Sequence, residues 1–353
     1  PYLVMGVQSN IKSCFRDPKS RMNKKVIKEN LTRALELVEG RKGWWGAPKL
    51  VVFPEFFIQG LAMDRPIKDW VAMSVTVPGE ETDVIAAAAK RLGSYISACV
   101  YEYDPNFPKR YFDTSFIVDP KGKIILKYRQ HYGGLFCGYS VPNDVLTEFI
   151  KRYGKDSLFP VVDTPIGKLG ALICFDTNFP EVARCLALNG AEVLIHSTGE
   201  PRGWYREYWE LAKRSRAYEN VAYLISVNRA NWLGTILPVD ESEGRSMVVD
   251  YTGRILAVAD TGNEATVRAE INIESLRQRR QNPLWNFLGH LQTGLHSEFY
   301  QREIWPSDHF AQNPPEDQAD YQELQAKIMD LMVKHGVVKK PEARRKVTPT
   351  TVG

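Results

Sequence analysis

The pattern that most constrains this fold is an alternation of apolar, strand-like runs with amphipathic helical runs, which occurs twice along the chain. Each set ends in a similar hairpin, SFIVDPKGKIILKY at 115–128 and SMVVDYTGRILAVA at 246–259. In both hairpins a valine–aspartate pair is followed by two variable residues, a glycine, a basic residue and isoleucine. Such alternation is typical of α/β layers, and two similar halves predict sheets packed face to face with helices outside. We expect a four-layer αββα sandwich.

The hydrophobic periodicity also predicts where the main elements lie. Strands are expected at 2–8, 49–57, 95–101, 169–173, 191–198 and 221–228, and helices at 26–40, 81–92, 144–153 and 206–220. We expect residues 1–300 to form one hydrolase domain. Residues 301–353 should form a C-terminal extension that takes part in subunit contacts, with a helix near 320–334 and a disordered basic end.

Composition restricts the function classes further. The 46 basic and 42 acidic residues are dispersed, apart from a basic run near 339–346, and do not form a nucleic-acid-binding module. The five cysteines are scattered without a CxxC pair, which favours neither a disulfide framework nor a zinc site. With no signal-like start and no apolar run of membrane-spanning length, we expect a cytoplasmic protein without nucleic-acid or membrane partners.

Cys174 stands out as a candidate nucleophile. It lies in LGALICFDTNFPEVAR at 169–184, where an apolar strand is followed by a turn and by a helix that starts near Pro180. A thiol at such a turn faces backbone N–H groups that stabilise a developing anion. An isolated cysteine after an apolar run is more often a core residue, so the interpretation needs partners elsewhere in the chain.

Two charged residues are candidate partners. Glu55 follows Pro54 at the end of a strand, among phenylalanines that should raise its pKa and suit it to accept a thiol proton. Lys127 lies near the end of the strand IILKY, where its ammonium would stabilise an anionic intermediate. Taken singly, these two would be an ordinary ion-pair partner and a surface lysine.

Taken together, FPEFF, LKYR and ICFDTNFPE resemble the nitrilase (carbon-nitrogen hydrolase) superfamily. The resemblance covers residues 2–300 and includes RSRAYENVAYLISVN. It implies a catalytic triad of Glu55, Lys127 and Cys174, an oxyanion site that includes the Phe175 N–H, and no metal or organic cofactor. It also implies a homodimer or higher homo-oligomer that associates through helices beside the active site.

One departure concerns a second glutamate, which that family usually carries in the loop after the lysine. No glutamate occurs between Lys127 and Thr147. Glu148 is the first candidate for this role, with a solvated helix position as the alternative, and Asp144 is a weaker substitute. The loop 131–144 should shape the substrate pocket, to which we also assign His131 and Trp204, although lone histidines are more often structural.

The resulting hypothesis is an amidase that converts an amide to a carboxylic acid and ammonia through a thioester on Cys174. The tail EFYQREIWPSDHF resembles the extended ends of aliphatic amidases. A nitrilase or a carbamoyl-amide hydrolase would use the same triad, and a non-catalytic binding protein on the same fold is a further alternative. A papain-like protease would need a histidine base, and none of the six histidines lies in a supporting motif.

Overall fold

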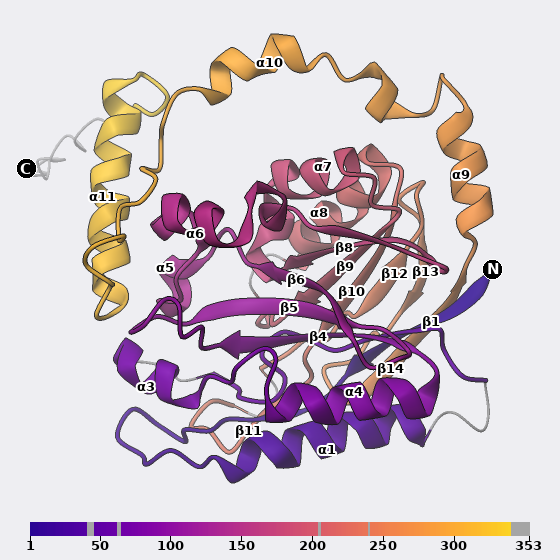
Figure 1. Cartoon of the computed structure of the whole chain (residues 1–353), viewed down its shortest axis with the longest axis horizontal. Helices are drawn as coiled ribbons and strands as arrows, with labels where there is room; N and C mark the ends of the chain where they lie inside the picture. The colour runs from indigo at the N-terminus through magenta and orange to yellow at the C-terminus, as the bar shows by residue number, and fades with distance from the viewer. Residues whose placement is uncertain (41–45, 62–64, 204–205, 239–240, 340–353) are drawn as a thin grey trace, which may run out of the picture.

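Two six-stranded sheets pack face to face in the computed structural model, which describes the chain except residues 41–45, 62–64, 204–205, 239–240 and 340–353 (Figure 1). The first sheet has the order β14 (Ala265–Ile271), β1 (Tyr2–Gln8), β3 (Leu50–Val52), β4 (Tyr95–Glu102), β5 (Phe112–Val118) and β6 (Ile124–Arg129). The second has the order β13 (Ile255–Val258), β12 (Met247–Val249), β10 (Tyr223–Asn228), β9 (Val193–Thr198), β8 (Gly167–Ile173) and β7 (Val161–Thr164). The prediction of an α/β sandwich is confirmed.

The two sheets have the same internal plan. The strands β1, β3 and β4 are parallel, as are β8, β9 and β10, while the outer pairs are antiparallel. Each half ends in the hairpin that the sequence repeat predicts. Asp119 and Asp250 accept hydrogen bonds from the backbone of their own turns, and Gly122 and Gly253 take the left-handed conformation there, with φ of 79° and 81°. The sequence repeat therefore reflects the same turn conformation, held by the same types of residue, in both hairpins.

Helices form the outer layers (Figure 1). The first sheet is covered by α1 (Lys25–Glu39) and α4 (Glu80–Leu92), and the second by α7 (Pro180–Leu188) and α8 (Arg206–Glu219). Helix α1 buries Ile27, Leu31 and Leu35, whose spacing of four places them on one face. Burying an aliphatic side chain of this size contributes about 2 kcal/mol, so this stripe holds the helix on the sheet.

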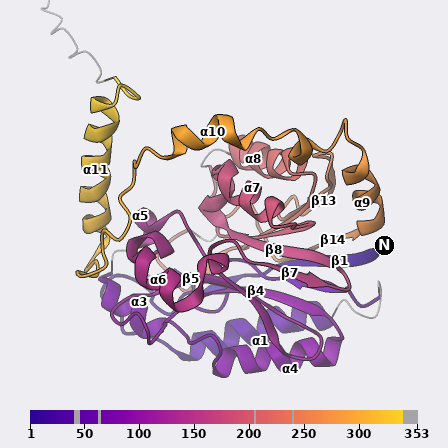
Figure 2. The same ribbon diagram turned by 45° about the horizontal axis from the view of Figure 1, so that its top comes forward.

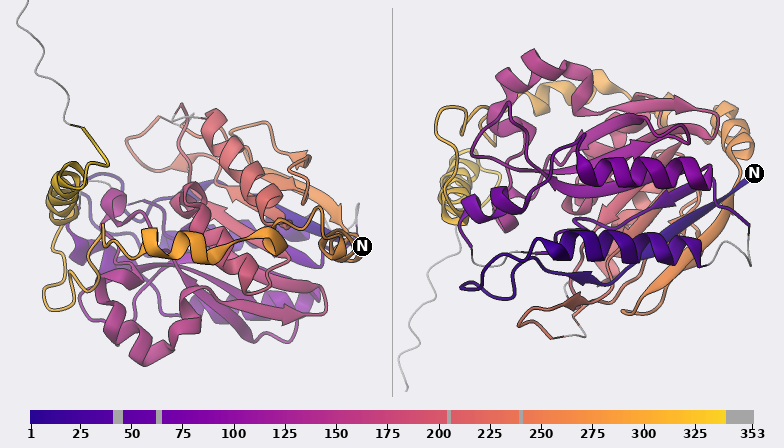
Figure 3. Two further views of the ribbon diagram at one scale, coloured as in Figure 1. Left: turned by 90° about the horizontal axis from the view of Figure 1, so that it is seen from above. Right: turned by 60° about the horizontal axis from the view of Figure 1, so that its bottom comes forward.

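The C-terminal segment runs along the outside of the sandwich as α9 (Ile273–Gln281), α10 (Thr293–Tyr300) and α11 (Gln318–Lys334) (Figures 1 and 2). Seen from above, α10 crosses the side that carries α7, where the Tyr300 hydroxyl donates to Glu181 at 2.8 Å (Figure 3). Helix α11 buries Tyr321, Leu324 and Ile328 in a small cluster of its own. The helix expected near 320–334 is confirmed, and most of the basic end lies outside the described residues.

Among the described helices, none has both the length and the apolar character that crossing a membrane requires.

Candidate active site

Cys174 lies where β8 gives way to a short turn, Cys174–Asn178, which leads into α7. Its φ is +41°, a left-handed conformation that is uncommon for a residue with a Cβ. Such conformations persist only where the surroundings hold them and occur often at functional sites. The local course of the chain is that predicted from LGALICFDTNFPEVAR.

One buried carboxylate, Asp176, holds this turn. Its Oδ2 accepts hydrogen bonds from the Tyr128 hydroxyl at 2.7 Å and from the Ile173 N–H at 3.1 Å. Its Oδ1 accepts the N–H groups of His131 and Tyr132 at 3.2 and 3.1 Å. The carboxylate therefore ties the cysteine turn of the second sheet to the end of β6 in the first sheet.

Cys174 is half-buried. Burial raises the pKa of Cys174 to about 11, while the Gly199 N–H, the Thr198 hydroxyl and Glu55 act in the opposite direction on this pKa because they favour the thiolate. His196 contacts the turn, with its Nε2 at 3.0 Å from the Cys174 carbonyl oxygen. A thiol with a raised pKa needs a base that takes its proton as it attacks.

Glu55 has the position that such a base requires. It follows β3, is 3% exposed and interacts with the Cys174 thiol. Burial and the nearby Cys174 sulfur raise the pKa of the Glu55 carboxyl well above its usual range. The next residue, Phe56, has a φ of +36°, so both partners lie in constrained backbone. The structure thus brings together Glu55 and Cys174, as the sequence predicts.

The approach of the two sheets is close at Gly199, just after β9. A Cβ built there would lie 2.9 Å from Glu55 Oε2 and 2.5 Å from Phe56 Cζ. Glycine is therefore required by the space between the end of β9 and the Glu55 loop.

The structure does not bring Lys127 to this pair. Its Nζ lies 2.8 Å from Glu102 Oε1 and 3.2 Å from the Val77 carbonyl oxygen. Successive side chains of a strand point to opposite faces, and Lys127 points to the face of β6 that carries Arg129, away from the second sheet. The interpretation of Lys127 as the triad lysine disagrees with this geometry, because the sequence motif does not show which face of β6 is internal.

The side chain that β6 directs toward the cysteine is that of Gln130. It is 1% exposed, and its Nε2 donates to the Ile173 carbonyl oxygen at 3.0 Å. Its Oε1 is buried and has no hydrogen-bond partner among the described residues. The sequence analysis missed Gln130, although its spacing from Leu126 and Tyr128, four and two residues away, placed all three on one face of an extended strand.

Asp113 on β5 is a second residue that the sequence analysis missed. It is fully buried, interacts with the Glu55 carboxyl group, and lies 3.1 Å from the Cys99 Sγ through Oδ1. Only the pairing of β5 with β4 brings these residues together, so no local pattern could have identified them.

Two other predicted site residues have different surroundings. Glu148 is on α6 (Leu146–Tyr153), half-buried, with 42% of its side chain exposed, and paired with Lys151 and Arg152. The expectation that it supplies the second glutamate is not supported by this placement, because the hydrophilic face of α6 turns to solvent.

The His131 side chain has a packing role. Its ring packs against Phe159, with the ring Nε2 at 2.6 Å from the Leu158 carbonyl oxygen, and burial lowers its pKa to about 4, so the ring is neutral. Phe175 follows Cys174 and packs against Phe179. Trp204 lies outside the described residues.

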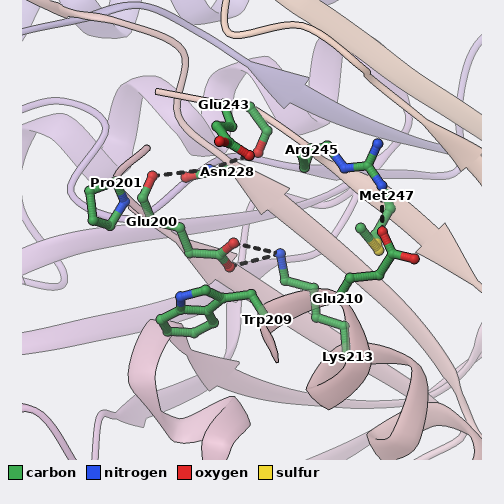
Figure 4. Close-up of a pocket in the computed structure, with 10 residues that line it drawn as sticks. Glu200, Pro201, Trp209, Glu210, Lys213, Asn228, Glu243, Arg245 and Met247 are labelled. Carbon is green, nitrogen blue, oxygen red and sulfur yellow. Dashed lines mark hydrogen bonds and ion pairs between the residues drawn. The ribbon is translucent and has the colours of Figure 1, made fainter. Parts of the chain in front are cut away.

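A small polar pocket adjoins the site (Figure 4). Glu200 accepts a hydrogen bond from the Thr198 hydroxyl at 3.1 Å and pairs with Lys213 at 2.7 Å. On the other side of the pocket Arg245 pairs with Glu210. The pocket has a volume of about 20 Å³, which is room for about one water molecule.

In the part of the chain that the structure describes, no three His, Cys, Asp or Glu side chains form a group that could hold a metal ion.

The comparison with protein families now decides the class. Residues 19–281 match the family model described as carbon-nitrogen hydrolase. The chain belongs to the carbon-nitrogen hydrolase family. Over 258 residues it is 33% identical to the formamidase of Bacillus thuringiensis strain Al Hakam, an alignment that covers 72% of this chain and 71% of that protein. The formamidase of Bacillus cereus strain AH820 matches with the same identity and coverage.

Solved structures agree with this assignment. Saccharomyces cerevisiae Nit3, a member of branch 10 of the nitrilase superfamily, superposes with a TM-score of 0.60 and 25% identity, covering 79% of this chain and 94% of that one. The carbon-nitrogen hydrolase from Helicobacter pylori G27 shares the fold, with a TM-score of 0.65, 21% identity and coverage of 85% and 98%. This carbon-nitrogen hydrolase is an amidase-type enzyme.

Proposed function

We propose that this carbon-nitrogen hydrolase converts a small amide to its carboxylic acid and ammonia through a thioester on Cys174. The observation that carries the proposal is the contact between Cys174, held in a left-handed turn, and the buried Glu55. The relatives named formamidase favour a short acyl group. A nitrile or a carbamoyl amide would react at the same pair, but no feature of the site favours either.

In the first half of the reaction, Glu55 accepts the thiol proton as the sulfur attacks the carbonyl carbon. The Phe175 N–H and the Gln130 side chain then stabilise the oxyanion. The Gln130 amide carries two N–H donors, and one of them bonds to the Ile173 carbonyl, so the second is available to the intermediate. Gln130 takes the place that the sequence assigned to Lys127.

In the second half, Glu55 passes its proton to the leaving nitrogen, and ammonia departs. Glu55 next accepts a proton from water, whose oxygen attacks the thioester carbon. The carbon–sulfur bond breaks, the carboxylic acid leaves, and the thiol regains its proton. Every proton thus passes through one carboxyl group, and the chemistry requires no metal or organic cofactor.

We also propose that the hydrolase domain spans residues 1–300 and works as a homo-oligomer, with 301–353 as the extension. Large apolar side chains are exposed on α8 and α10, where the family resemblance implies subunit contacts. These are Tyr208, Leu211, Tyr218, Leu295, Phe299 and Tyr300. A reducing compartment such as the cytoplasm suits the five free cysteines.

Intact-protein mass spectrometry during turnover tests the proposal. Formamide, acetamide and propionamide are supplied in turn while released ammonia is assayed. An acyl adduct and ammonia should appear with the wild type and with Cys185→Ala, a control on α7, and both should be absent from Cys174→Ala. Ammonia release that persists in folded Cys174→Ala would contradict the proposal.

A further inference from the structure

Two carboxyl groups lie side by side behind the nucleophile. Glu55 comes from the loop after β3 and Asp113 from β5, two strands away in the same sheet, and the two carboxyl groups interact with each other. Glu55 is 3% exposed and Asp113 is fully buried. A hydrogen bond between two carboxyl groups requires a proton on one of them, because ionised carboxylates only accept.

The remaining contacts of the two carboxyl groups also indicate a proton between them. Asp113 Oδ1 lies 3.1 Å from the Cys99 Sγ, and the Thr114 N–H also bonds to the Asp113 carboxyl. Asp113 Oδ2 and Glu55 Oε2, however, are buried with no donor among the described residues. Leaving a buried acceptor unsatisfied is unfavourable, and placing two anions in contact is more so. One proton between the carboxyls removes both penalties.

We propose that Asp113 is a positioning residue that shares a single proton with Glu55 in the resting enzyme. The proposal rests on the proposed function only in taking Glu55 as the base. The resting pair carries one proton and one negative charge. When the sulfur–carbon bond forms, the thiol proton moves to Glu55 and the pair holds two protons.

The pair then returns to its resting state as the carbon–nitrogen bond breaks and one proton leaves with ammonia. In the second half it accepts a proton from the attacking water and gives it to sulfur as the carbon–sulfur bond breaks. Asp113 thus keeps Glu55 oriented toward Cys174 through both transfers. It also raises the basicity of Glu55, because a second carboxylate favours the protonated form.

The other ionisable groups around the pair do not offset its negative charge in place of this proton. They are Cys99 and Tyr101 on β4, Cys137 on α5 (Gly134–Cys137), Tyr139, Cys174 and Arg229. Burial raises the pKa of each thiol and phenol in this group, so these groups remain neutral near pH 7. Arg229, the one cation of the set, forms an ion pair with Glu241.

Infrared difference spectroscopy tests the shared proton without turnover. At mildly alkaline pH the wild type should show the carbonyl band of a buried protonated carboxyl, and this band should disappear in Asp113→Asn and equally in Glu55→Gln. The double variant should lose no more than either single variant. Asp144→Asn, which removes a different buried carboxyl, is the control and should leave this band unchanged. A band that survives either single substitution would overturn the proposal.

The pH dependence of kcat/KM separates positioning from a structural role. In Asp113→Asn the amide N–H stabilises the ionised Glu55, so the acidic limb should move down by about one pH unit or more, with kcat about tenfold lower. A merely structural role would lower kcat without moving the limb, which would count against the proposal. If Cys174→Ala keeps its activity while the infrared result holds, the proposed function fails and the shared proton stands.

Discussion

Replacing Lys127 and Gln130 by the same residue, methionine, should separate stability from catalysis at two positions three residues apart on β6. Lys127 bonds to the buried Glu102 on the helix-covered side of the sheet, and Gln130 bonds to the Ile173 carbonyl beside the nucleophile. Methionine is similar in size to both side chains and carries no charge or strong hydrogen-bonding group, so the two variants are a matched pair.

The structure sets the expected size of each effect. In Lys127→Met, Glu102 keeps its bonds to Arg129 and Thr114 at 2.8 and 2.7 Å and loses one charge-assisted hydrogen bond. Such a bond contributes about 1.5–3 kcal/mol. The Lys127 side chain is 30% exposed, so water partly replaces it and the lower value applies. For a chain of 353 residues this corresponds to a Tm lower by about 2 °C.

Gln130→Met loses one neutral hydrogen bond, worth about 1 kcal/mol, but it also removes the buried Oε1 that has no partner, so its Tm should change little. The loss of an oxyanion donor lowers kcat by about 100-fold, or about 2.7 kcal/mol. The assays are ammonia release at saturating amide and thermal unfolding of both variants. A 100-fold loss of kcat in Lys127→Met, with Gln130→Met still active, would refute the reasoning and restore Lys127 to the triad.

Three further predictions follow from the geometry. Gly199→Ala should lower kcat by at least about tenfold, because the new Cβ meets the Glu55 loop. Gly294→Ala, where the new Cβ lies in open space, should leave the rate of ammonia release unchanged. Equal rates in both variants would contradict this prediction. The pKa of Glu102 is lowered from 4.5 by Arg129, so this contact stabilises the fold above pH 4.5, and its contribution is lost as pH falls through the lowered value. In acid titration, the stability of Glu102→Gln should lack this loss. Unfolding curves that coincide with those of the wild type would exclude the contribution. Leu211→Asp on α8 should dissociate the proposed homo-oligomer in sedimentation experiments, and an unchanged mass would exclude this helix from the proposed interface.

Much of the fold follows from local patterns in the sequence. The repeated hairpins, the apolar runs and the spacing of Ile27, Leu31 and Leu35 predict the elements and the α/β layers, because a strand or helix must bury the face that its own period makes apolar. Cys174 and Glu55 are predictable for a similar reason. Each directly follows a short apolar strand, and the carboxyl ends of parallel strands gather at one edge of a sheet.

The other partners depend on the tertiary structure. The motif LKYR presents Lys127 as the natural cation, but the pairing of β6 with β5 turns Tyr128 and Gln130 toward the second sheet and Lys127 away from it. A shift of one residue in that pairing would exchange the two faces, and nothing local to the motif determines it. Asp113 meets Glu55 only across two neighbouring strands. The sequence by itself determines the proposed nucleophile and its proposed base because both lie on local turns, whereas the residues that complete the site depend on the register of distant strands.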